Sequence, residues 1–118
     1  MINKSELRKG NIVTLSKQIV TIKEVFEETV LAKLNTGEEI FFSIKSIFPI
    51  SITHTMLIDK LNFIKFSKSS GIYLNSIFVL DQDDGRFLTI PNNGPIYYLH
   101  ELQNLYFETT NIELDFKI

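Results

Sequence analysis

Apolar and polar residues alternate over the first fifty positions of the chain, which is the period of strands with one buried face. In "NIVTLSK", residues 11–17, Val13 and Leu15 alternate with polar neighbours. The same pattern returns at residues 18–26, 29–35 and 39–44. Strands joined by such short links pair antiparallel. We therefore expect residues 1–50 to form a curled antiparallel meander or a small SH3-like barrel, whose closure hides the strand edges.

Glycine and proline mark the limits of this β region. Gly37 lies in the turn "NTGEE" between the third and fourth predicted strands, where a left-handed backbone is easiest for glycine. Gly10 precedes the first strand, a position at which SH3-like barrels often carry a glycine. Pro49 ends the region because proline cannot donate to a sheet ladder.

The segment "SITHTMLIDKLNFIKF", residues 51–66, predicts a short helix. Thr53 is a good N-cap residue, and Leu57 and Leu61 lie four residues apart on one helical face. Asn62 stands where helices often end on a left-handed residue. The helix is then about two turns long.

A second β region follows in "SSGIYLNSIFVLDQDDGRFLTI". Asp84-Gly85 separates two apolar runs, residues 77–80 and 87–90, and this arrangement is a strong hairpin signal. Residues 71–74 add a third strand before the hairpin. The expected result is a three-stranded antiparallel piece.

A final helix is predicted from Ile96 to Thr110, with Pro95 setting its first turn. At about 100° per residue around the helix, one arc is expected to face the core and consists of Tyr98, Leu99, Leu102, Leu105, Tyr106 and Thr109. The opposite, solvated arc takes Tyr97, Glu101, Asn104 and Glu108. A shoulder between the arcs takes Ile96, His100, Gln103 and Phe107, which mix polar and apolar chemistry.

The composition is that of one globular domain. The chain has 118 residues, of which 44% are hydrophobic and 22% are charged, as in ordinary folded proteins. We expect a single α+β domain over residues 1–118, with a barrel-like β region at 1–50 and a helix, a hairpin and a helix at 51–118. The absence of cysteine fits a reducing cytoplasm. No apolar run approaches the roughly 20 residues of a membrane span, so we expect a soluble protein with no membrane partner.

Charge argues against a nucleic-acid partner without excluding one. The chain has 12 basic and 14 acidic residues and a net charge of −2, whereas binding to a phosphate backbone favours a basic excess. Arg8 and Lys9, beside Gly10, are the candidates for binding a single anion. The alternative is that these two residues form a solvated basic turn.

His100 and Gln103 form the most promising binding pair. One helical turn apart, an imidazole and an amide can together read a base edge, a phosphate or a peptide carbonyl, and Phe107 adds a stacking surface. The alternative is that both side chains tie the helix to backbone groups at a sheet edge, because buried polar groups need partners. An exposed shoulder could also serve as the interface of a homo-oligomer.

The sequence predicts no catalytic, cofactor or metal site. Its two histidines, His54 and His100, lie on different elements and lack the short spacing of zinc ligands. There is no G-x-S-x-G motif and no P-loop. Paired acids such as Glu27-Glu28 lie in predicted turns, where carboxylates are usually solvated. We therefore expect a protein that is not an enzyme.

Three segments carry motifs that occur together elsewhere. The first, "SELRKGNIV", contains an L-R-x-G-N opening, and the last, "YYLHELQNLYFETTNIEL", contains H-x-L-Q-N-L-Y-F. With "PISITHTMLIDKLNFIK" between them, they resemble a group of small proteins encoded by phages, prophages and mobile elements of gut Bacteroidales. The chain departs from the group at Asn62, where glycine is usual, and at Ser51-Ile52, where Pro-Leu is usual. The resemblance implies a genomic setting and no particular chemistry.

These observations favour a non-enzymatic accessory protein of a phage or mobile element that acts in the host cytoplasm. It would bind a host protein or a small ligand, and blocking a host defence is one role of this kind. Two alternatives stay open: a nucleic-acid-associated protein of phage replication or packaging, and a structural component of the virion.

Overall fold

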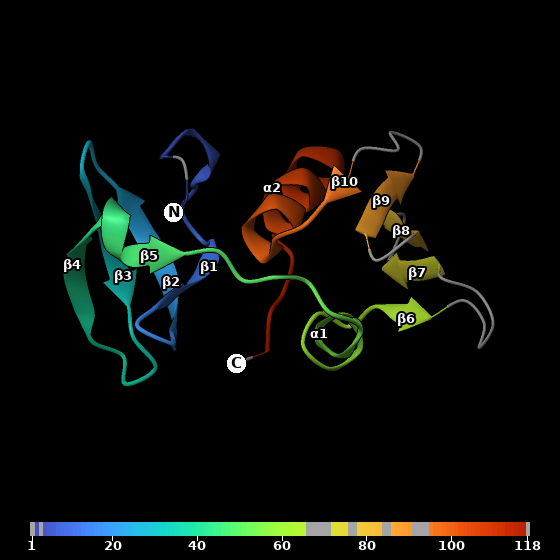
Figure 1. Cartoon of the computed structure of the whole chain (residues 1–118), viewed down its shortest axis with the longest axis horizontal. Coiled ribbons are helices and arrows are strands. Elements are labelled where there is room, and N and C mark those ends of the chain that lie inside the picture. Colours follow the sequence, from blue (N-terminus) through green and yellow to red (C-terminus); the bar gives the residue numbers. More distant parts are fainter. Residues whose placement is uncertain are drawn as a thin grey trace. The chain divides into compact units, whose positions relative to one another are not determined.

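The computed structural model describes residues 2, 4–65, 72–75, 78–83, 86–90 and 95–117. The chain is α+β, as predicted, with antiparallel sheets, a short helix and a C-terminal helix (Figure 1). It divides into two compact units. Unit 1 is made of Met1–Ser51 and Tyr98–Asn104, and unit 2 of Ile52–Tyr97 and Leu105–Ile118. Helix α2, Leu99–Thr110, therefore supplies residues to both units.

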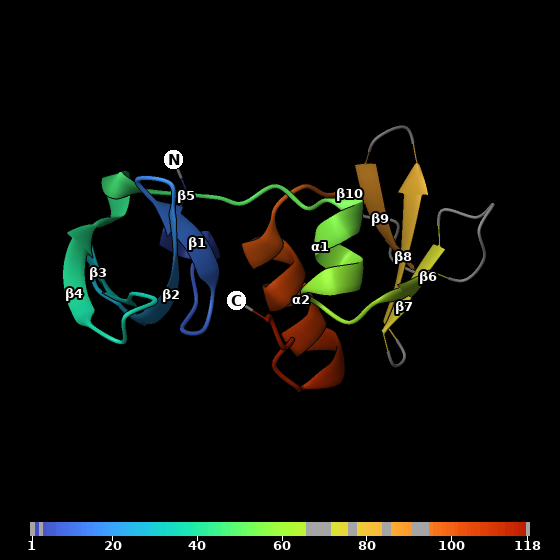
Figure 2. The same cartoon turned by 90° about the horizontal axis from the view of Figure 1, so that it is seen from below.

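Unit 1 contains a five-stranded antiparallel sheet in the order β4-β3-β2-β1-β5. The strands are β1 (Ile12–Leu15), β2 (Gln18–Val25), β3 (Thr29–Lys33), β4 (Glu39–Ser43) and β5 (Ile47–Phe48). Two 3-10 turns, η1 (Lys4–Glu6) and η2 (Ile44–Ser46), lie before β1 and between β4 and β5. The sheet is strongly curved (Figure 2). The predicted meander is confirmed, whereas η2 and β5 were not predicted.

Left-handed backbone makes three turns of unit 1 possible. Gly10 and Gly37 have φ of 96° and 93°, which a side chain tolerates poorly. The Gly10 N–H donates to the Ile22 carbonyl at 2.7 Å and so fixes the entry to β1. Ser16 and Lys17 also have positive φ, 47° and 70°, and form the two-residue link between β1 and β2. Such links favour left-handed residues because their twist matches that of the strands.

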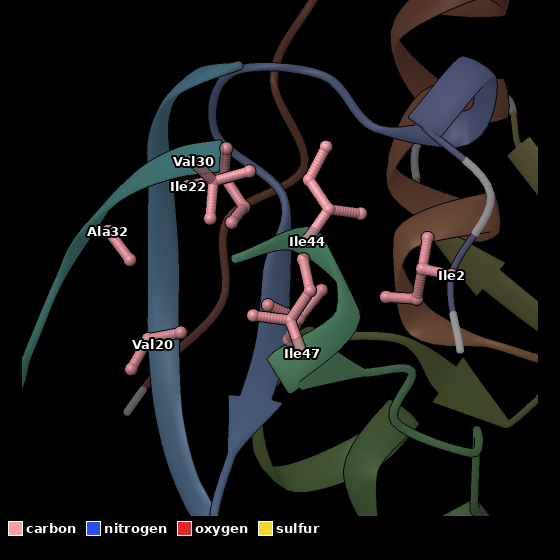
Figure 3. Packing of buried hydrophobic residues seen from close by; sticks show 8 residues of the cluster. Ile2, Val20, Ile22, Val30, Ala32, Ile44 and Ile47 are labelled. Carbon is pink, nitrogen blue, oxygen red and sulfur yellow. The ribbon is translucent and has the colours of Figure 1, made fainter. Parts of the chain in front are cut away.

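The core of unit 1 is aliphatic and comes from alternate positions of its strands (Figure 3). Side chains two residues apart on a strand point to the same face, and Val20 with Ile22 on β2 meets Val30 with Ala32 on β3 in this way. The full set of buried members is Ile2, Val13, Val20, Ile22, Val30, Ala32, Ile44 and Ile47. Burial of each large aliphatic side chain contributes about 1.5–3 kcal/mol.

Unit 2 contains helix α1, His54–Asp59, and a second antiparallel sheet in the order β10-β9-β8-β7-β6. Its strands are β6 (Ile64–Lys65), β7 (Ile72–Asn75), β8 (Phe78–Asp83), β9 (Arg86–Ile90) and β10 (Pro95–Ile96). The predicted three strands correspond to β7, β8 and β9, and the sheet has two short strands more. The predicted Asp84-Gly85 turn lies outside the described residues.

The ends of α1 agree with the sequence. The Thr53 hydroxyl accepts a hydrogen bond from the Met56 N–H at 3.1 Å, which satisfies one free donor of the first turn. Asn62 has φ of 60° shortly after the helix, as expected for a left-handed residue. Leu57 and Leu61 are both buried.

The start of helix α2 differs from the prediction. The helix begins at Leu99, not Ile96, and Pro95 does not set its first turn. Pro95 and Ile96 instead form β10, which pairs with β9 at the edge of the sheet, where proline is tolerated because one side of the strand needs no donor. Glu101 accepts a hydrogen bond from the Tyr98 N–H at 3.0 Å just ahead of the helix. Sheet pairing of residues 95–96 therefore overrides the helical periodicity.

None of the helices in the described part of the chain is long and apolar enough to cross a membrane.

Replacing Thr53 by alanine should lower the free energy of unfolding by about 1 kcal/mol, because the Met56 N–H loses its acceptor. Thr55→Ala, which changes an exposed residue inside the same helix, is the matched control and should change stability by less than about 0.5 kcal/mol. Urea unfolding of both variants measures the difference. Equal stabilities would show that the cap does not stabilise α1.

Candidate functional site

Gln103 on helix α2 forms a two-point link to the start of β1. Its Oε1 accepts from the Ile12 N–H at 2.7 Å, and its Nε2 donates to the Gly10 carbonyl at 3.0 Å. The side chain is only 1% exposed. One amide thus satisfies a backbone donor and a backbone acceptor that the sheet leaves unpaired, as buried backbone groups require. This arrangement is the structural alternative considered for Gln103, with the amide bound to backbone at a sheet edge.

Asn104, next to Gln103, holds the turn that precedes β1. Its Oδ1 accepts from Arg8 Nε at 3.1 Å and from Asn11 Nδ2 at 2.8 Å. Its Nδ2 donates to the Glu6 carbonyl at 2.7 Å. Asn11, itself buried, accepts from the Arg8 N–H at 2.7 Å. The prediction that Asn104 lies on the solvated side is therefore wrong: the residue is half-buried, and its amide accepts two hydrogen bonds from residues 6–11 and donates one to them.

The opening segment and the ending segment of the chain are thus one hydrogen-bonded network. Arg8, Gly10 and Asn11 belong to the L-R-x-G-N opening, and Gln103 and Asn104 belong to the H-x-L-Q-N-L-Y-F ending. The five residues belong to unit 1. Their polar groups bind one another and nearby backbone, which gives the two motifs a common structural role.

The other residues of the predicted site are spread out. Arg8 also donates to the Lys9 carbonyl at 3.1 Å, so much of its guanidinium binds within the chain, while the Lys9 side chain is exposed. Phe107 is half-buried and belongs to unit 2, whereas His100 and Gln103 belong to unit 1. Within unit 1 the structure brings Arg8 and Gln103 together, with Arg8 Nη2 donating to the Gln103 carbonyl at 3.4 Å.

His100 is buried, as in the structural alternative considered for it, but its ring does not tie the helix to backbone groups. The residue is 1% exposed and its ring stacks on Tyr98, with ring centroids 6.1 Å apart and planes 13° apart. Neither ring nitrogen has a hydrogen-bond partner among the described residues. The Glu6 carboxylate lies 3.6 Å from Nε2. This distance is too long for a hydrogen bond and allows an ion pair only when the imidazole is protonated.

The buried face of α2 consequently differs from the predicted arc. Leu99, Leu102 and Tyr106 are buried as expected. Tyr98 is 37% exposed and Thr109 is exposed, while His100 and Gln103 take their place inside. Leu105 is half-buried. Long-range hydrogen bonds to the start of β1 determine which face of the helix is buried. These bonds cannot be predicted from the helical periodicity of the sequence.

The second histidine lies in unit 2. His54 Nδ1 is hydrogen-bonded to the Tyr73 hydroxyl, and the two rings meet edge to face. Burial raises the pKa of the Tyr73 phenol above its ordinary value, so the hydroxyl stays neutral. Tyr73 also contacts Phe87 edge to face, with ring centroids 5.8 Å apart. Within the described residues there is no group of three histidine, aspartate or glutamate side chains that could hold a metal ion.

A cavity of about 520 Å³ in unit 1 was not predicted. Its lining consists of Ile2, Lys4, Glu27, Glu28, Ser43, Ile44 and Lys45. The link after β2 and the start of η2 meet here because the Ile44 N–H donates to the Glu28 carbonyl at 3.1 Å. The sequence analysis placed the Glu27-Glu28 pair in a solvated turn. The sequence offered one signal for the cavity: an acidic pair, Glu27-Glu28, follows the second strand of the meander, and a lysine, Lys45, follows the fourth.

Two accessible polar regions of unit 1 therefore remain as binding candidates: the basic turn at Lys9 and the charged cavity. Comparisons with protein-family models, with curated protein sequences and with solved structures found no match. What the chain binds has to be inferred from its own residues.

Substitution of Gln103 by methionine should lower the free energy of unfolding by about 1–3 kcal/mol, because the Ile12 N–H and the Gly10 carbonyl lose their partner without a large change in volume. Gln18→Met makes the same chemical change at an exposed position of β2 and should alter stability by less than about 0.5 kcal/mol. Denaturant unfolding compares the two. A loss no larger than that of the control would contradict the structural role of Gln103.

For His100 the expected effect has the opposite sign. His100→Leu should leave the free energy of unfolding at neutral pH unchanged or raise it by up to about 1 kcal/mol, because two buried nitrogens without partners are removed. His54→Leu should cost about 1 kcal/mol, because the buried Tyr73 hydroxyl loses its hydrogen bond. Thermal unfolding of both variants tests the contrast. A large loss for His100→Leu would show that the imidazole has a stabilising partner.

Proposed function

We propose that this chain is a non-enzymatic binding module of a phage or mobile element, and that the unit 1 cavity binds a small ligand carrying both a positive and a negative group. The observation that carries the proposal is the lining of this cavity, in which two lysines and two glutamates surround two isoleucines. The phage setting is supported by the resemblance of the opening and ending segments. Action in the host cytoplasm follows from that setting.

The chemistry of the lining supports a zwitterionic ligand with an apolar part. Ile2 and Ile44 are buried at 3% and 9% exposure and provide an apolar floor. The side chains of Lys4 and Lys45 are exposed, as are those of Glu27 and Glu28. No ion pair joins these four charges among the described residues. An anionic group beside the lysines and a cationic group beside the glutamates would each gain a partner.

The same charges disfavour the nucleic-acid alternative, and the lining offers no imidazole for acid–base catalysis. A phosphate backbone entering the cavity would meet the Glu27-Glu28 pair as well as the lysines, and each repulsive contact lowers its affinity. The cavity lining has no histidine. His100, the imidazole that the sequence singled out, is buried beneath Tyr98.

An SH3-like barrel is the finer fold that we propose for unit 1. The strand order β4-β3-β2-β1-β5, with a 3-10 turn between β4 and β5, supports it. Curvature of the sheet supports it as well (Figure 2). In such a fold the links between strands gather at the ends of the sheet, where loops commonly form binding sites.

A titration followed by amide chemical shifts tests the ligand class. Free amino acids and dipeptides with an apolar side chain are the zwitterionic probes, and an alkylamine and a fatty acid each lack one charge. We expect the zwitterions to shift the amides of Glu27, Glu28 and residues 43–45 with at least about tenfold higher affinity than either single-charge probe, a difference of about 1.4 kcal/mol.

Two variants locate the site. The double variant Lys4→Ala with Lys45→Ala should weaken the zwitterion at least about tenfold. Lys9→Ala, which changes an exposed lysine outside the cavity, should leave binding unchanged. The proposal would be overturned if zwitterion binding were lost in Lys9→Ala and kept in the double variant. Tighter binding of a single-stranded oligonucleotide than of any zwitterion would overturn it as well.

A further inference from the structure

Strand β4 is an edge strand that exposes apolar side chains. It ends the order β4-β3-β2-β1-β5, and four of its five residues are exposed. Phe41 is 62% exposed, and its ring contacts that of Phe26, itself 43% exposed, at a centroid distance of 5.8 Å. Edge strands usually carry proline, lysine or a bulge that prevents further pairing. The sequence of β4, "EIFFS", contains neither proline nor lysine.

The backbone pattern shows which groups of β4 face the open edge. The Leu34 N–H donates to the Glu38 carbonyl and the Ile44 N–H donates to the Glu28 carbonyl. Hydrogen-bonded pairs alternate along an antiparallel ladder, so residues 38, 40, 42 and 44 direct their backbone groups toward β3. Glu39, Phe41 and Ser43 therefore direct their N–H and C=O groups away from the sheet.

These three residues can pair with themselves across a two-fold axis. In an antiparallel pair centred on Phe41, this residue lies opposite Phe41 of the other copy and Glu39 lies opposite Ser43. All outward groups then find partners, in about six hydrogen bonds. Shifting the centre by one residue in either direction leaves Glu39 or Ser43 without an outward partner from β4. The centred register is thus the one that satisfies the whole strand.

Side chains and charges agree with this register. Phe42 packs against the core, so Phe41 lies on the opposite face of the sheet with Phe26. The axis therefore brings two such aromatic pairs together, and directly opposed aromatic side chains stabilise strand pairs. The single charged residue of β4, Glu39, faces Ser43 and not another carboxylate. We propose that the chain forms a symmetric dimer by antiparallel pairing of β4 with β4 of a second copy.

Ser43 belongs both to β4 and to the lining of the proposed ligand cavity, but Phe41 and Phe48 do not line the cavity, so variants at these two residues test the dimer separately from the ligand. An interface of one short strand and four phenylalanine rings is smaller than a standard protein interface, so the affinity should be modest, with a dissociation constant on the order of 10–100 µM. Sedimentation velocity from about 5 to about 500 µM should show the mean mass rising from 13.7 kDa toward twice that value.

Phe41→Lys should weaken dimerisation at least about tenfold, because two like charges meet at the axis. Phe48→Lys is the matched control, since it makes the same change at a 49% exposed phenylalanine on the other edge strand, and it should leave dimerisation unchanged. A wild-type chain that stays monomeric to about 500 µM would overturn the proposal. So would dimerisation that is lost in Phe48→Lys and kept in Phe41→Lys.

Cross-linking tests the register without relying on a disruptive variant. The chain has no cysteine, so a single introduced thiol reports only its own position. Across the axis the Cα atoms of residue 41 would be about 5.5 Å apart, within the range that a disulfide spans. Phe41→Cys should form a disulfide-linked dimer at least about tenfold faster than Phe48→Cys under mild oxidation. Equal rates would exclude the centred pairing.

Discussion

The bridge from Gln103 to Gly10 and Ile12 is the interaction on which the architecture of unit 1 depends. The sheet leaves one N–H and one C=O without partners where the chain enters β1, and a single amide with both functions meets them. An acid offers only acceptors and a lysine only donors, so glutamine is one of the few residues suited to the position. Asn104 extends the link to Glu6, Arg8 and Asn11.

The polar network also explains why a histidine is tolerated inside. Gln103 fixes the rotation of α2 about its axis. His100 lies about one turn earlier on the same face of the helix, so its side chain is buried as well. Its burial leaves two ring nitrogens without hydrogen-bond partners among the described residues, which is a local cost to folding. Tyr98 reduces that cost by covering the ring with a parallel aromatic face.

Local features of the fold could be read from the sequence. The alternation of apolar and polar residues predicted β1 to β4. Gly37 and Asn62 were predicted to have a left-handed backbone, and the side chain of Thr53 predicted the start of α1. Each depends on residues a few positions apart. The burial of His100 and Gln103 depends instead on backbone groups more than 90 residues away, and a helical wheel has no access to them. The cavity was not predicted for the same reason, because Ile2 and Ile44 come together only when unit 1 folds.

The distance in sequence between the two halves of the network has a kinetic consequence. Ile12 and Gln103 are 91 residues apart, and Glu6 and Asn104 are 98 apart. A ribosome adds about 5–20 residues per second, so the strands of unit 1 emerge several seconds before the helical residues that satisfy their entry. Until residue 104 is made, the segment leading into β1 must keep its polar groups in water. Contacts of such long range slow folding, and unit 1 should therefore reach its final form late, after all of residues 52–97 have been synthesised.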